Sequence, residues 1–260
     1  MPLISRVDVL GVGISAVDME TTLSLITSWV ENRESQYVCV TGVHGVMESV
    51  RDEGIRKIHN KAGLTVPDGM PMVWCAHRAG ASNVERVAGP DLMLRLAARA
   101  ATDGWTSFFY GGAEGVGEIL AARLERDFPG FRTVGTHSPP FRELTEDEDD
   151  AIVDLINASR PDLVWVGLST PKQECWMAAH LGRLEVPVLL GVGAAFDINA
   201  GLVPRAPDWM QRSGLEWLFR LRTEPRRLWR RYLRNNPAFV SRLAFRPPTL
   251  IDPEGKAEIS

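Results

Sequence analysis

Short apolar runs alternate along the chain with longer segments in which apolar residues recur every three or four positions. The short runs are typical of buried strands, and the longer periodic segments are typical of amphipathic helices. The pattern predicts seven strands, at residues 7–10, 37–40, 64–66, 106–110, 132–134, 163–167 and 188–192. It also predicts eight helices, near residues 18–32, 44–51, 69–78, 90–101, 115–127, 146–159, 172–182 and 209–222.

This alternation indicates an α/β fold with a Rossmann-like, mainly parallel sheet that carries helices on both faces. After Gly201 the pattern changes, because no strand is predicted there and tryptophans recur among arginines. Pro225 stands where a new helix can begin. We therefore predict a Rossmann-like α/β domain at residues 1–204, an Arg/Trp-rich helical appendage at 205–246 and a flexible tail at 247–260.

The net charge of −4 hides an uneven distribution. Residues 205–260 carry +6, whereas the first 204 residues carry −10. Eleven arginines stand between Arg205 and Arg246. A segment this basic favours phosphate groups or an anionic membrane surface. A basic helix packed on the acidic body is the structural alternative.

The three cysteines, Cys39, Cys75 and Cys175, form no CxxC pair, and each stands in an apolar run. We predict that all three are reduced core residues, with neither a disulfide nor a metal site. The N-terminal residues lack the basic and apolar segments of a signal peptide, and no run approaches ~18 apolar residues. These features predict a cytoplasmic protein.

Two glycine motifs follow predicted strands. Residues 11–16 fit G-x-G-x-x-A, but the next helix begins later, at Asp18, than a dinucleotide-binding motif requires. Gly111 and Gly112 lie between a strand and a helix, where backbone N–H groups and a helix N-terminus can bind phosphate. A tight turn that merely needs glycine is the alternative.

Polar residues also follow four of the predicted strands at the point where each strand ends. They are Thr41, His44, Asp68, Lys172, Gln173, Glu174 and Asp197. Because the carboxyl ends of parallel strands meet at one edge of a sheet, we expect these residues to form one ligand site. Each residue alone has a structural alternative, and for Asp68 this alternative is a helix cap.

Several motifs occur together and in order: PDGM, ERVAGPDLM, FFYGG, STPKQECW, GVGAAFDINAG and PRAPDWMQRSGLEWLFRLRTEPRRLWRRY. In these motifs the chain resembles the WecG/TagA/CpsF glycosyltransferases, glycosyltransferase family 26. The resemblance extends from about Val7 to Phe239. One departure is that family members often carry T-x-N after the second strand, whereas Thr41-Gly42-Val43-His44 lacks the Asn.

The resemblance implies an inverting enzyme that moves a sugar from a UDP-sugar donor to a polyprenyl-diphosphate-linked saccharide. It implies a role in bacterial exopolysaccharide or cell-envelope glycan synthesis, at the inner face of the cell membrane. The expected partners are the UDP-sugar, the lipid-linked acceptor and the anionic membrane surface, without nucleic acid. No cofactor or metal is expected, and the number of copies in the assembly is left open.

The resemblance also implies roles for single residues. Asp68 is the expected catalytic base, which takes the proton from the acceptor hydroxyl. The expected acceptor-binding residues are Thr41, His44 and Arg86. The expected donor-binding residues are Gly111, Gly112, Lys172, Gln173, Glu174 and Asp197. The arginines expected to bind the diphosphate and the membrane are Arg220, Arg226, Arg227, Arg230 and Arg231.

Two other functions compete with this interpretation. The glycine motif at residues 11–16 favours a nucleotide-dependent oxidoreductase or epimerase. The Arg/Trp-rich segment favours a non-catalytic membrane adaptor. Under the glycosyltransferase interpretation, truncation before Arg220 is expected to leave a folded α/β body that transfers almost no sugar.

Overall fold

The structure is a computed structural model that describes residues 4–251. Contacts between Cα atoms divide the chain into two compact units. Unit 1 comprises Met1–Thr22, Val40–Ala88 and Pro204–Ser260, and unit 2 comprises Leu23–Cys39 and Gly89–Val203. This division differs from the predicted boundaries, because residues 205–246 group with unit 1 and do not stand alone.

The main sheet has six strands in the order β4-β3-β8-β7-β5-β6. They are β3 (Gln36–Thr41), β4 (Leu64–Pro67), β5 (Thr106–Gly111), β6 (Arg132–His137), β7 (Leu163–Gly167) and β8 (Val188–Gly191). The pairs β3–β8, β8–β7, β7–β5 and β5–β6 are parallel. The predicted Rossmann-like sheet is therefore confirmed, and six of the seven predicted strands belong to it.

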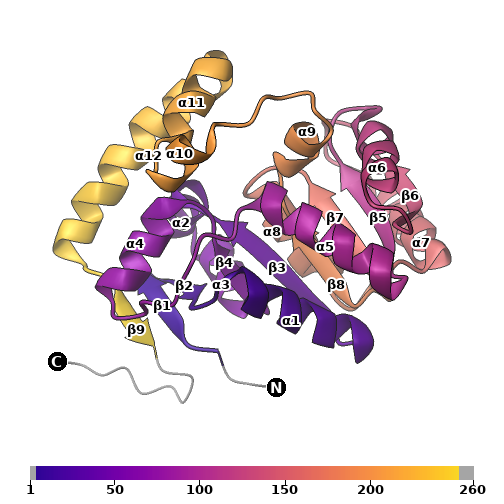
Figure 1. The fold of residues 1–260 in the computed structure, drawn as a ribbon, viewed down its shortest axis with the longest axis horizontal. Helices are drawn as coiled ribbons and strands as arrows, with labels where there is room; N and C mark the ends of the chain where they lie inside the picture. The colour runs from indigo at the N-terminus through magenta and orange to yellow at the C-terminus, as the bar shows by residue number, and fades with distance from the viewer. Residues whose placement is uncertain (1–3, 252–260) are drawn as a thin grey trace. The chain divides into compact units, whose positions relative to one another are not determined.

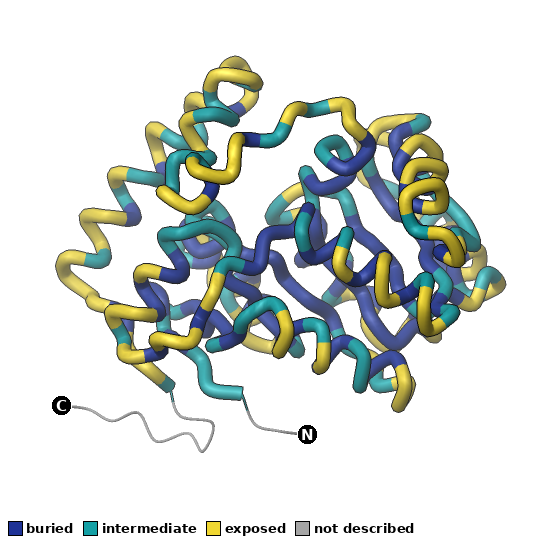
Figure 2. The backbone as a smooth tube through the Cα atoms, in the orientation of Figure 1, coloured by how far each residue is buried: buried dark blue, intermediate teal, exposed yellow. Residues whose placement is uncertain are grey.

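Unit 2 holds the helices that flank most of this sheet (Figure 1). They are α5 (Gly89–Asp103), α6 (Val116–Asp127), α7 (Glu146–Ser159), α8 (Lys172–His180) and α9 (Ala195–Asn199), together with most of α1 (Met19–Glu31). A capping box starts α7, because Thr145 and Glu148 each accept the other's backbone N–H. The strands of the main sheet are mostly buried (Figure 2). Phe109 and Trp165 stack in this core at 6.4 Å between ring centroids.

Unit 1 contains a second, antiparallel sheet in the order β2-β1-β9, formed by β1 (Arg6–Val9), β2 (Val12–Ser15) and β9 (Thr249–Ile251). The turn between β1 and β2 has Leu10 at φ 57° and Gly11 at φ 96°. Left-handed conformations at both central residues are typical of a tight hairpin turn. The G-x-G-x-x-A motif therefore forms a hairpin and not the strand-to-helix turn that binds a dinucleotide. The basis of the oxidoreductase interpretation is thereby removed.

The remaining helices of unit 1 are α2 (Val43–Arg51), α3 (Glu53–Lys61), α4 (Met70–Arg78), α10 (Asp208–Arg212), α11 (Glu216–Thr223) and α12 (Pro225–Phe245). The single helix predicted at residues 209–222 is wrong, because Gly214 at φ 74° separates α10 from α11. The prediction that Pro225 begins a helix is confirmed. Sequence patterns missed α3, α9 and β2.

The C-terminal segment is part of the folded body of unit 1. Strand β9 pairs with β1, so the prediction of a flexible tail is wrong for residues 249–251; residues 252–260 lie outside the described residues. Phe239 of α12 is buried in a core cluster with Val7, Val46 and Met72. A truncation before Arg220 would remove both features, so point substitutions are the better test of this segment.

Gly111 and Gly115 offer a matched test of close backbone packing in unit 2. Both have positive φ, but a Cβ on Gly111 would lie 2.7 Å from the Gly167 carbonyl carbon, whereas a Cβ on Gly115 meets nothing within 4 Å. We expect Gly115→Ala to lower the free energy of unfolding by roughly 1 kcal/mol, from backbone strain alone. Gly111→Ala should lower it by roughly 1–3 kcal/mol more, because the methyl group has no space.

Chemical denaturation of both variants measures this difference. Equal stability losses would show that the close approach of Gly111 to Gly167 does not constrain the fold.

Candidate active site

Unit 1 places Asp68 beside the end of β3. The backbone N–H of Asp68 donates to the Thr41 carbonyl at 3.0 Å. Only glycine fits at position 42, because a Cβ there would lie 2.9 Å from the Asp68 carbonyl oxygen. The N-cap of α4 is Gly69, at φ 85°, and not Asp68. Asp68 thus stands one residue before the N-cap position of α4, and its role as a base stays a prediction.

Thr41 is buried at this strand end, and its hydroxyl has no hydrogen-bond partner within the described protein. A buried polar group without a partner costs about 1–3 kcal/mol of stability. Such a group is retained where a ligand or a bound water supplies the missing bond. The hydroxyl of Thr41 is therefore available for a substrate contact.

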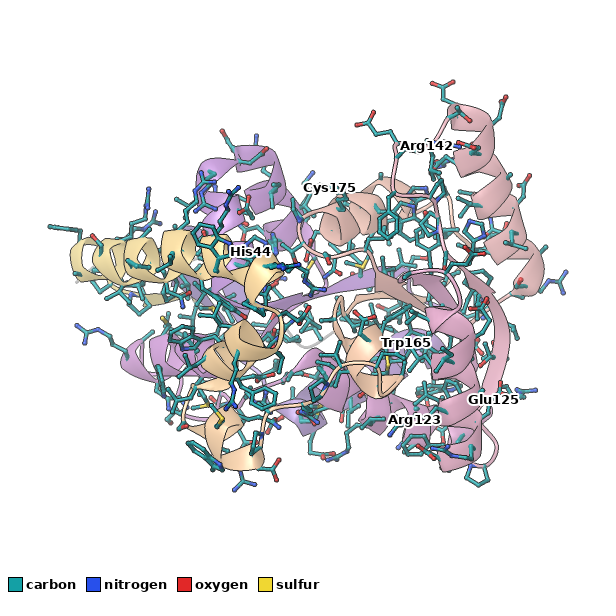
Figure 3. All side chains as sticks on the ribbon, turned by 90° about the horizontal axis from the view of Figure 1, so that it is seen from above. His44, Arg123, Glu125, Arg142, Trp165 and Cys175 are labelled. Carbon is teal, nitrogen blue, oxygen red and sulfur yellow. The ribbon has the colours of Figure 1, made fainter. Side chains whose placement is uncertain are left out.

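His44 belongs to a polar cluster formed by α2 and α12. Its Nδ1 atom lies 3.0 Å from Nδ2 of Asn235, and Figure 3 labels His44 close to α12. The other end of the Asn235 amide accepts from Arg51 at 2.5 Å, and Arg51 also pairs with Glu48 at 2.6 Å. His44, which was predicted to bind the acceptor substrate, thus contacts a residue of α12 that lies 191 positions later in the chain.

Arg86 ties its loop to the helices of the C-terminal segment. Its guanidinium donates to Gln211 at 2.6 Å and pairs with Glu216 at 3.1 Å. Gln211 also accepts from Arg205 and donates to the Ala206 carbonyl. These bonds give Arg86 a structural role, and its contact with an acceptor stays a prediction.

The five predicted diphosphate-binding arginines lie on α11 and α12. Arg220 and Arg227 pair with Glu224 at 3.4 and 2.8 Å. Arg230 lies over the Trp229 ring, at 5.2 Å from its centroid, and Arg231 lies over Tyr232, at 5.3 Å. Arg226 is exposed. Two of the arginines therefore already have a carboxylate partner, while the other three retain guanidinium groups suited to phosphate.

One side of α12 combines exposed apolar and cationic side chains. Leu233 and Val240 are 68% and 67% exposed, and Trp229 is 45% exposed. Helical spacing places these three residues in one row and Arg226, Arg230 and Arg234 in the next row. Much of α12 is exposed (Figure 2), whereas Leu228, Asn235 and Phe239 are buried on the opposite face. A face of this kind suits a membrane interface.

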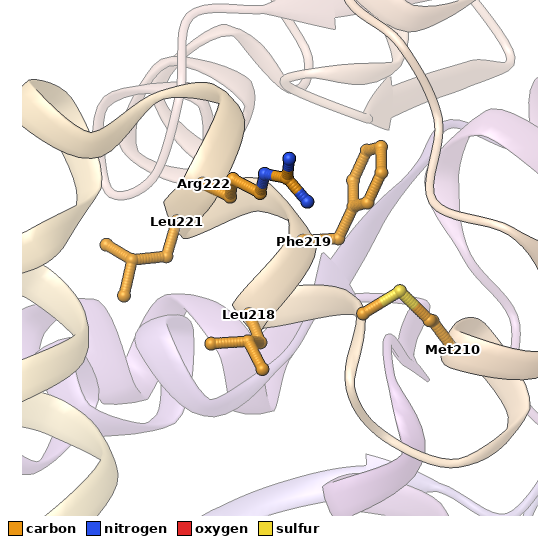
Figure 4. A pocket seen from close by; sticks show the side chains of 5 residues that line it. All are labelled: Met210, Leu218, Phe219, Leu221 and Arg222. Carbon is orange, nitrogen blue, oxygen red and sulfur yellow. The ribbon is translucent and has the colours of Figure 1, made fainter.

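A pocket of about 310 Å³ lies at α10 and α11 (Figure 4). It is lined by Met210, Leu218, Phe219, Leu221 and Arg222. Four apolar side chains beside one guanidinium group suit a molecule that combines an apolar chain with a negative charge.

In unit 2, Gln173 and Glu174 are buried in the first turn of α8. One Glu174 oxygen accepts from the Thr170 hydroxyl at 2.9 Å and from the Gln173 amide at 3.1 Å. The other Glu174 oxygen and the Gln173 carbonyl oxygen have no partner within the described protein. Two buried acceptors therefore lack donors at the carboxyl end of β7, where hydroxyl groups of a ligand would supply them.

Glycines bring the neighbouring strand ends close to Gln173. A Cβ on Gly191 would lie 3.3 Å from the Gln173 amide nitrogen, and a Cβ on Gly193 would lie 3.3 Å from its oxygen. The backbone N–H of Gly112 donates to the Gly167 carbonyl at 3.0 Å. The carboxyl ends of β5, β7 and β8 thus meet, as predicted.

The other predicted donor residues of unit 2 are less buried. Lys172 is exposed, and Asp197 is half-buried on α9. The prediction that Cys175 is a core residue is wrong, because it is exposed on α8 (Figure 3). Cys39 and Cys75 are buried as predicted.

An aromatic stack that sequence analysis missed supports α8. Trp176 stacks on Tyr110 and on His180, at 4.3 and 4.2 Å between ring centroids. His180 lies 3.0 Å from Asp149, which also pairs with Arg183. Burial raises the pKa of Tyr110, and the charge of Asp149 raises it further. The tyrosine is therefore neutral and serves as a packing residue.

Two further observations concern metal ligands and helix length in the described residues. Within residues 4–251, His, Cys, Asp and Glu side chains form no group of three or more that could hold a metal ion. None of the described helices is both long enough and apolar enough to cross a bilayer.

Comparison with known proteins gives consistent matches. Residues 7–249 match the model of the glycosyl transferase WecG/TagA/CpsF family. An N-acetylglucosaminyldiphosphoundecaprenol N-acetyl-beta-D-mannosaminyltransferase from Bacillus spizizenii is 31% identical over 228 residues, which cover 86% of each chain. A Staphylococcus aureus protein of the same name is 26% identical over 242 residues, which cover 92% of each chain.

Thr41 and Thr65 provide a test of the unpartnered hydroxyl. Thr41→Val should leave the free energy of unfolding unchanged or raise it by up to about 3 kcal/mol, because the hydroxyl makes no bond within the fold. Thr65→Val should lower it by about 1–3 kcal/mol, because the Thr65 hydroxyl donates to the His59 carbonyl at 2.7 Å.

Denaturation curves and sugar-transfer assays on both variants separate the two roles. A functional hydroxyl requires that the stable Thr41→Val protein loses transfer activity. Full activity in Thr41→Val would exclude Thr41 from the site.

Proposed function

Because the chain belongs to the WecG/TagA/CpsF glycosyltransferase family, we propose that it moves a sugar from a UDP-sugar to a polyprenyl-diphosphate-linked saccharide. The names of the relatives support an N-acetylhexosaminyl group as the transferred sugar and N-acetylglucosaminyl-diphosphopolyprenol as the acceptor. The reaction would contribute to a bacterial cell-envelope glycan or exopolysaccharide.

The observation that carries the mechanism is the position of Asp68 beside the buried Thr41 at the end of β3. In the proposed step, Asp68 takes the proton from the acceptor hydroxyl while that oxygen attacks the anomeric carbon of the donor. The bond from the anomeric carbon to the UDP oxygen breaks, and UDP leaves with the electron pair. A single displacement of this kind inverts the anomeric configuration. The Thr41 hydroxyl would orient the acceptor through a hydrogen bond.

We propose that the donor binds at the carboxyl ends of β5, β7 and β8. The unpartnered oxygens of Gln173 and Glu174 accept hydrogen bonds, so they suit sugar hydroxyls and repel phosphate. The glycine turn at Gly111-Gly112 and the start of α6 offer backbone N–H groups instead, which suit the diphosphate. Lys172 and Asp197 complete the proposed donor-binding set.

The negative charge that develops on the leaving diphosphate needs stabilisation. We propose that Arg226, Arg230 and Arg231 supply it, with no metal or other cofactor. Arg220 and Arg227 would contribute after exchange of their partner Glu224 for phosphate. Transfer that is insensitive to a chelator is expected.

We also propose that α12 holds the protein on the inner face of the cell membrane. Its exposed row of Trp229, Leu233 and Val240 would enter the headgroup region, beside arginines that attract anionic lipid. The pocket at α10 and α11 would receive the apolar chain of the acceptor near its phosphates. The number of protein copies at the membrane is open.

Asp68→Asn is the central test of catalysis. The amide keeps the shape of the side chain but takes no proton, so the transfer rate should fall by roughly 10²–10⁴-fold. Stability and UDP binding should stay at the wild-type level. Asp52→Asn is the matched control in the same unit, because Asp52 only caps α3 by accepting from Gly54 and Ile55, and an Asn also caps.

The assay screens UDP-sugars against a polyprenyl-diphosphate-linked N-acetylglucosamine acceptor, with release of UDP as the readout. Near-wild-type turnover by Asp68→Asn would remove Asp68 from the mechanism. A wild-type protein that binds vesicles but turns over no UDP-sugar would favour the adaptor interpretation.

Membrane binding can be tested by charge removal on α12. Neutralising Arg226, Arg230 and Arg234 with Gln should weaken binding to anionic vesicles by ~10²-fold, at about 1 kcal/mol for each arginine. The control neutralises Arg99, Arg123 and Arg126 in unit 2, which changes the net charge equally. Vesicle co-sedimentation at low and high salt measures both variants. The proposed surface would be contradicted if vesicle binding weakened equally in the two variants, or if it did not depend on the salt concentration.

A further inference from the structure

The loop between β6 and α7, residues 138–144, carries an exposed aromatic ring. Phe141 of this β6–α7 loop is 92% exposed, more than any other large hydrophobic side chain in the part of the chain that the structure describes. Contact between a phenyl ring and water is unfavourable, so a ligand that covers the ring gains binding free energy. The sequence motifs assigned no role to this residue.

The start of the β6–α7 loop is tied to the glycine turn that follows β5. The Ser138 hydroxyl lies 3.2 Å from the Ala113 carbonyl oxygen and 3.4 Å from the Gly111 carbonyl oxygen. Strands β5 and β6 are parallel neighbours, so the loop leaves the sheet at the same edge as the turn. Phe141 follows Ser138 by three residues, a reach of at most about 11 Å. Its ring can therefore contact a ligand that is bound at the glycine turn.

The loop is stiff before its tip and anchored after it. Pro139 and Pro140 precede Phe141, and proline restricts the backbone, so little freedom is lost when the loop closes on a ligand. Arg142 donates to both oxygens of Glu148 at 2.7 Å. These bonds hold the pKa of Glu148 down at about 2, so the pair stays charged at neutral pH. The guanidinium already has a carboxylate partner, which leaves the phenyl ring as the ligand-binding group of the tip.

The two neighbouring features require different parts of one ligand. Backbone N–H groups at the glycine turn suit a diphosphate. An exposed aromatic ring suits a nucleobase, because every base has a flat face that stacks on aromatic side chains. A nucleoside diphosphate has both groups, whereas inorganic diphosphate lacks the base.

We propose that the β6–α7 loop is a lid and that Phe141 closes over the nucleobase of the donor and stacks on it. Phe141 is thereby a donor-binding residue in addition to those that the sequence predicted. The inference rests on the proposed function, because it requires a UDP-sugar at the carboxyl ends of β5, β7 and β8.

Calorimetry with UDP and with inorganic diphosphate tests the stacking. Phe141→Ala should weaken UDP binding by about 5–150-fold, the effect of one lost base–aromatic stack, and leave the affinity for inorganic diphosphate unchanged. Phe141→Tyr keeps a stacking ring and should bind UDP like the wild type. Phe245→Ala is the matched control, because Phe245 is 90% exposed and belongs to unit 1. All three variants should unfold at the wild-type temperature, since both rings are on the surface.

The outcomes separate the lid from the proposed function. Equal UDP affinity in the wild type and Phe141→Ala would overturn the lid and leave the proposed function intact. A wild-type protein that binds no UDP would overturn both. If Phe141→Ala lost affinity for inorganic diphosphate as much as for UDP, the ring would only support the glycine turn, and the stacking would be overturned.

Fluorine NMR of protein labelled with fluorophenylalanine tests the closure. The chain has nine phenylalanines, and Phe141→Leu assigns the resonance of Phe141. UDP should shift this resonance and protect it from a dissolved paramagnetic quencher, whereas inorganic diphosphate should do neither. Vesicles of phosphatidylglycerol and phosphatidylethanolamine test the other partner that an exposed ring suits. Protection by these vesicles, with none from UDP, would assign Phe141 to a membrane contact and overturn the lid.

Discussion

The geometry of unit 1 depends on the hydrogen bond from the Asp68 backbone to the Thr41 carbonyl. This bond brings the ends of β3 and β4 so close together that only glycine fits at position 42. The backbone bond therefore fixes the point from which the Asp68 side chain leaves the chain. A base must stand within hydrogen-bond reach of the proton it takes, so a rigid strand end is a suitable place for it.

The two faces of α12 differ in their surroundings. Its inner face contributes Leu228, Asn235 and Phe239 to unit 1, while its outer face presents arginines and exposed apolar residues. A helix that only bound lipid would not need a buried amide bonded to two residues of α2. The inner contacts therefore join α12 to the residues that follow β3, and they explain why this segment is part of the folded unit.

The sequence predicted the elements that have strong local signals. Strand β7 and helix α7 were predicted with their observed ends, because an apolar run and a capping box mark them locally. Strand β9, with three residues, and helix α9, with five, are too short to show the period of their own type of element. Asn235 carried no signal at all, because its role depends on docking against a helix 191 positions away. Tertiary contacts of this kind cannot be inferred from local patterns.

Buried polar atoms without partners occur at several of the residues predicted for the site. Ten such side-chain atoms occur in the part of the chain that the structure describes. Five belong to residues predicted for the site, namely Thr41, Gln173, Glu174, Arg220 and Arg231. A fold selected for stability alone would remove such groups, because each one weakens it. Their chemistry differs, because the oxygens of Gln173 and Glu174 accept hydrogen bonds, whereas the Nε–H groups of Arg220 and Arg231 donate them.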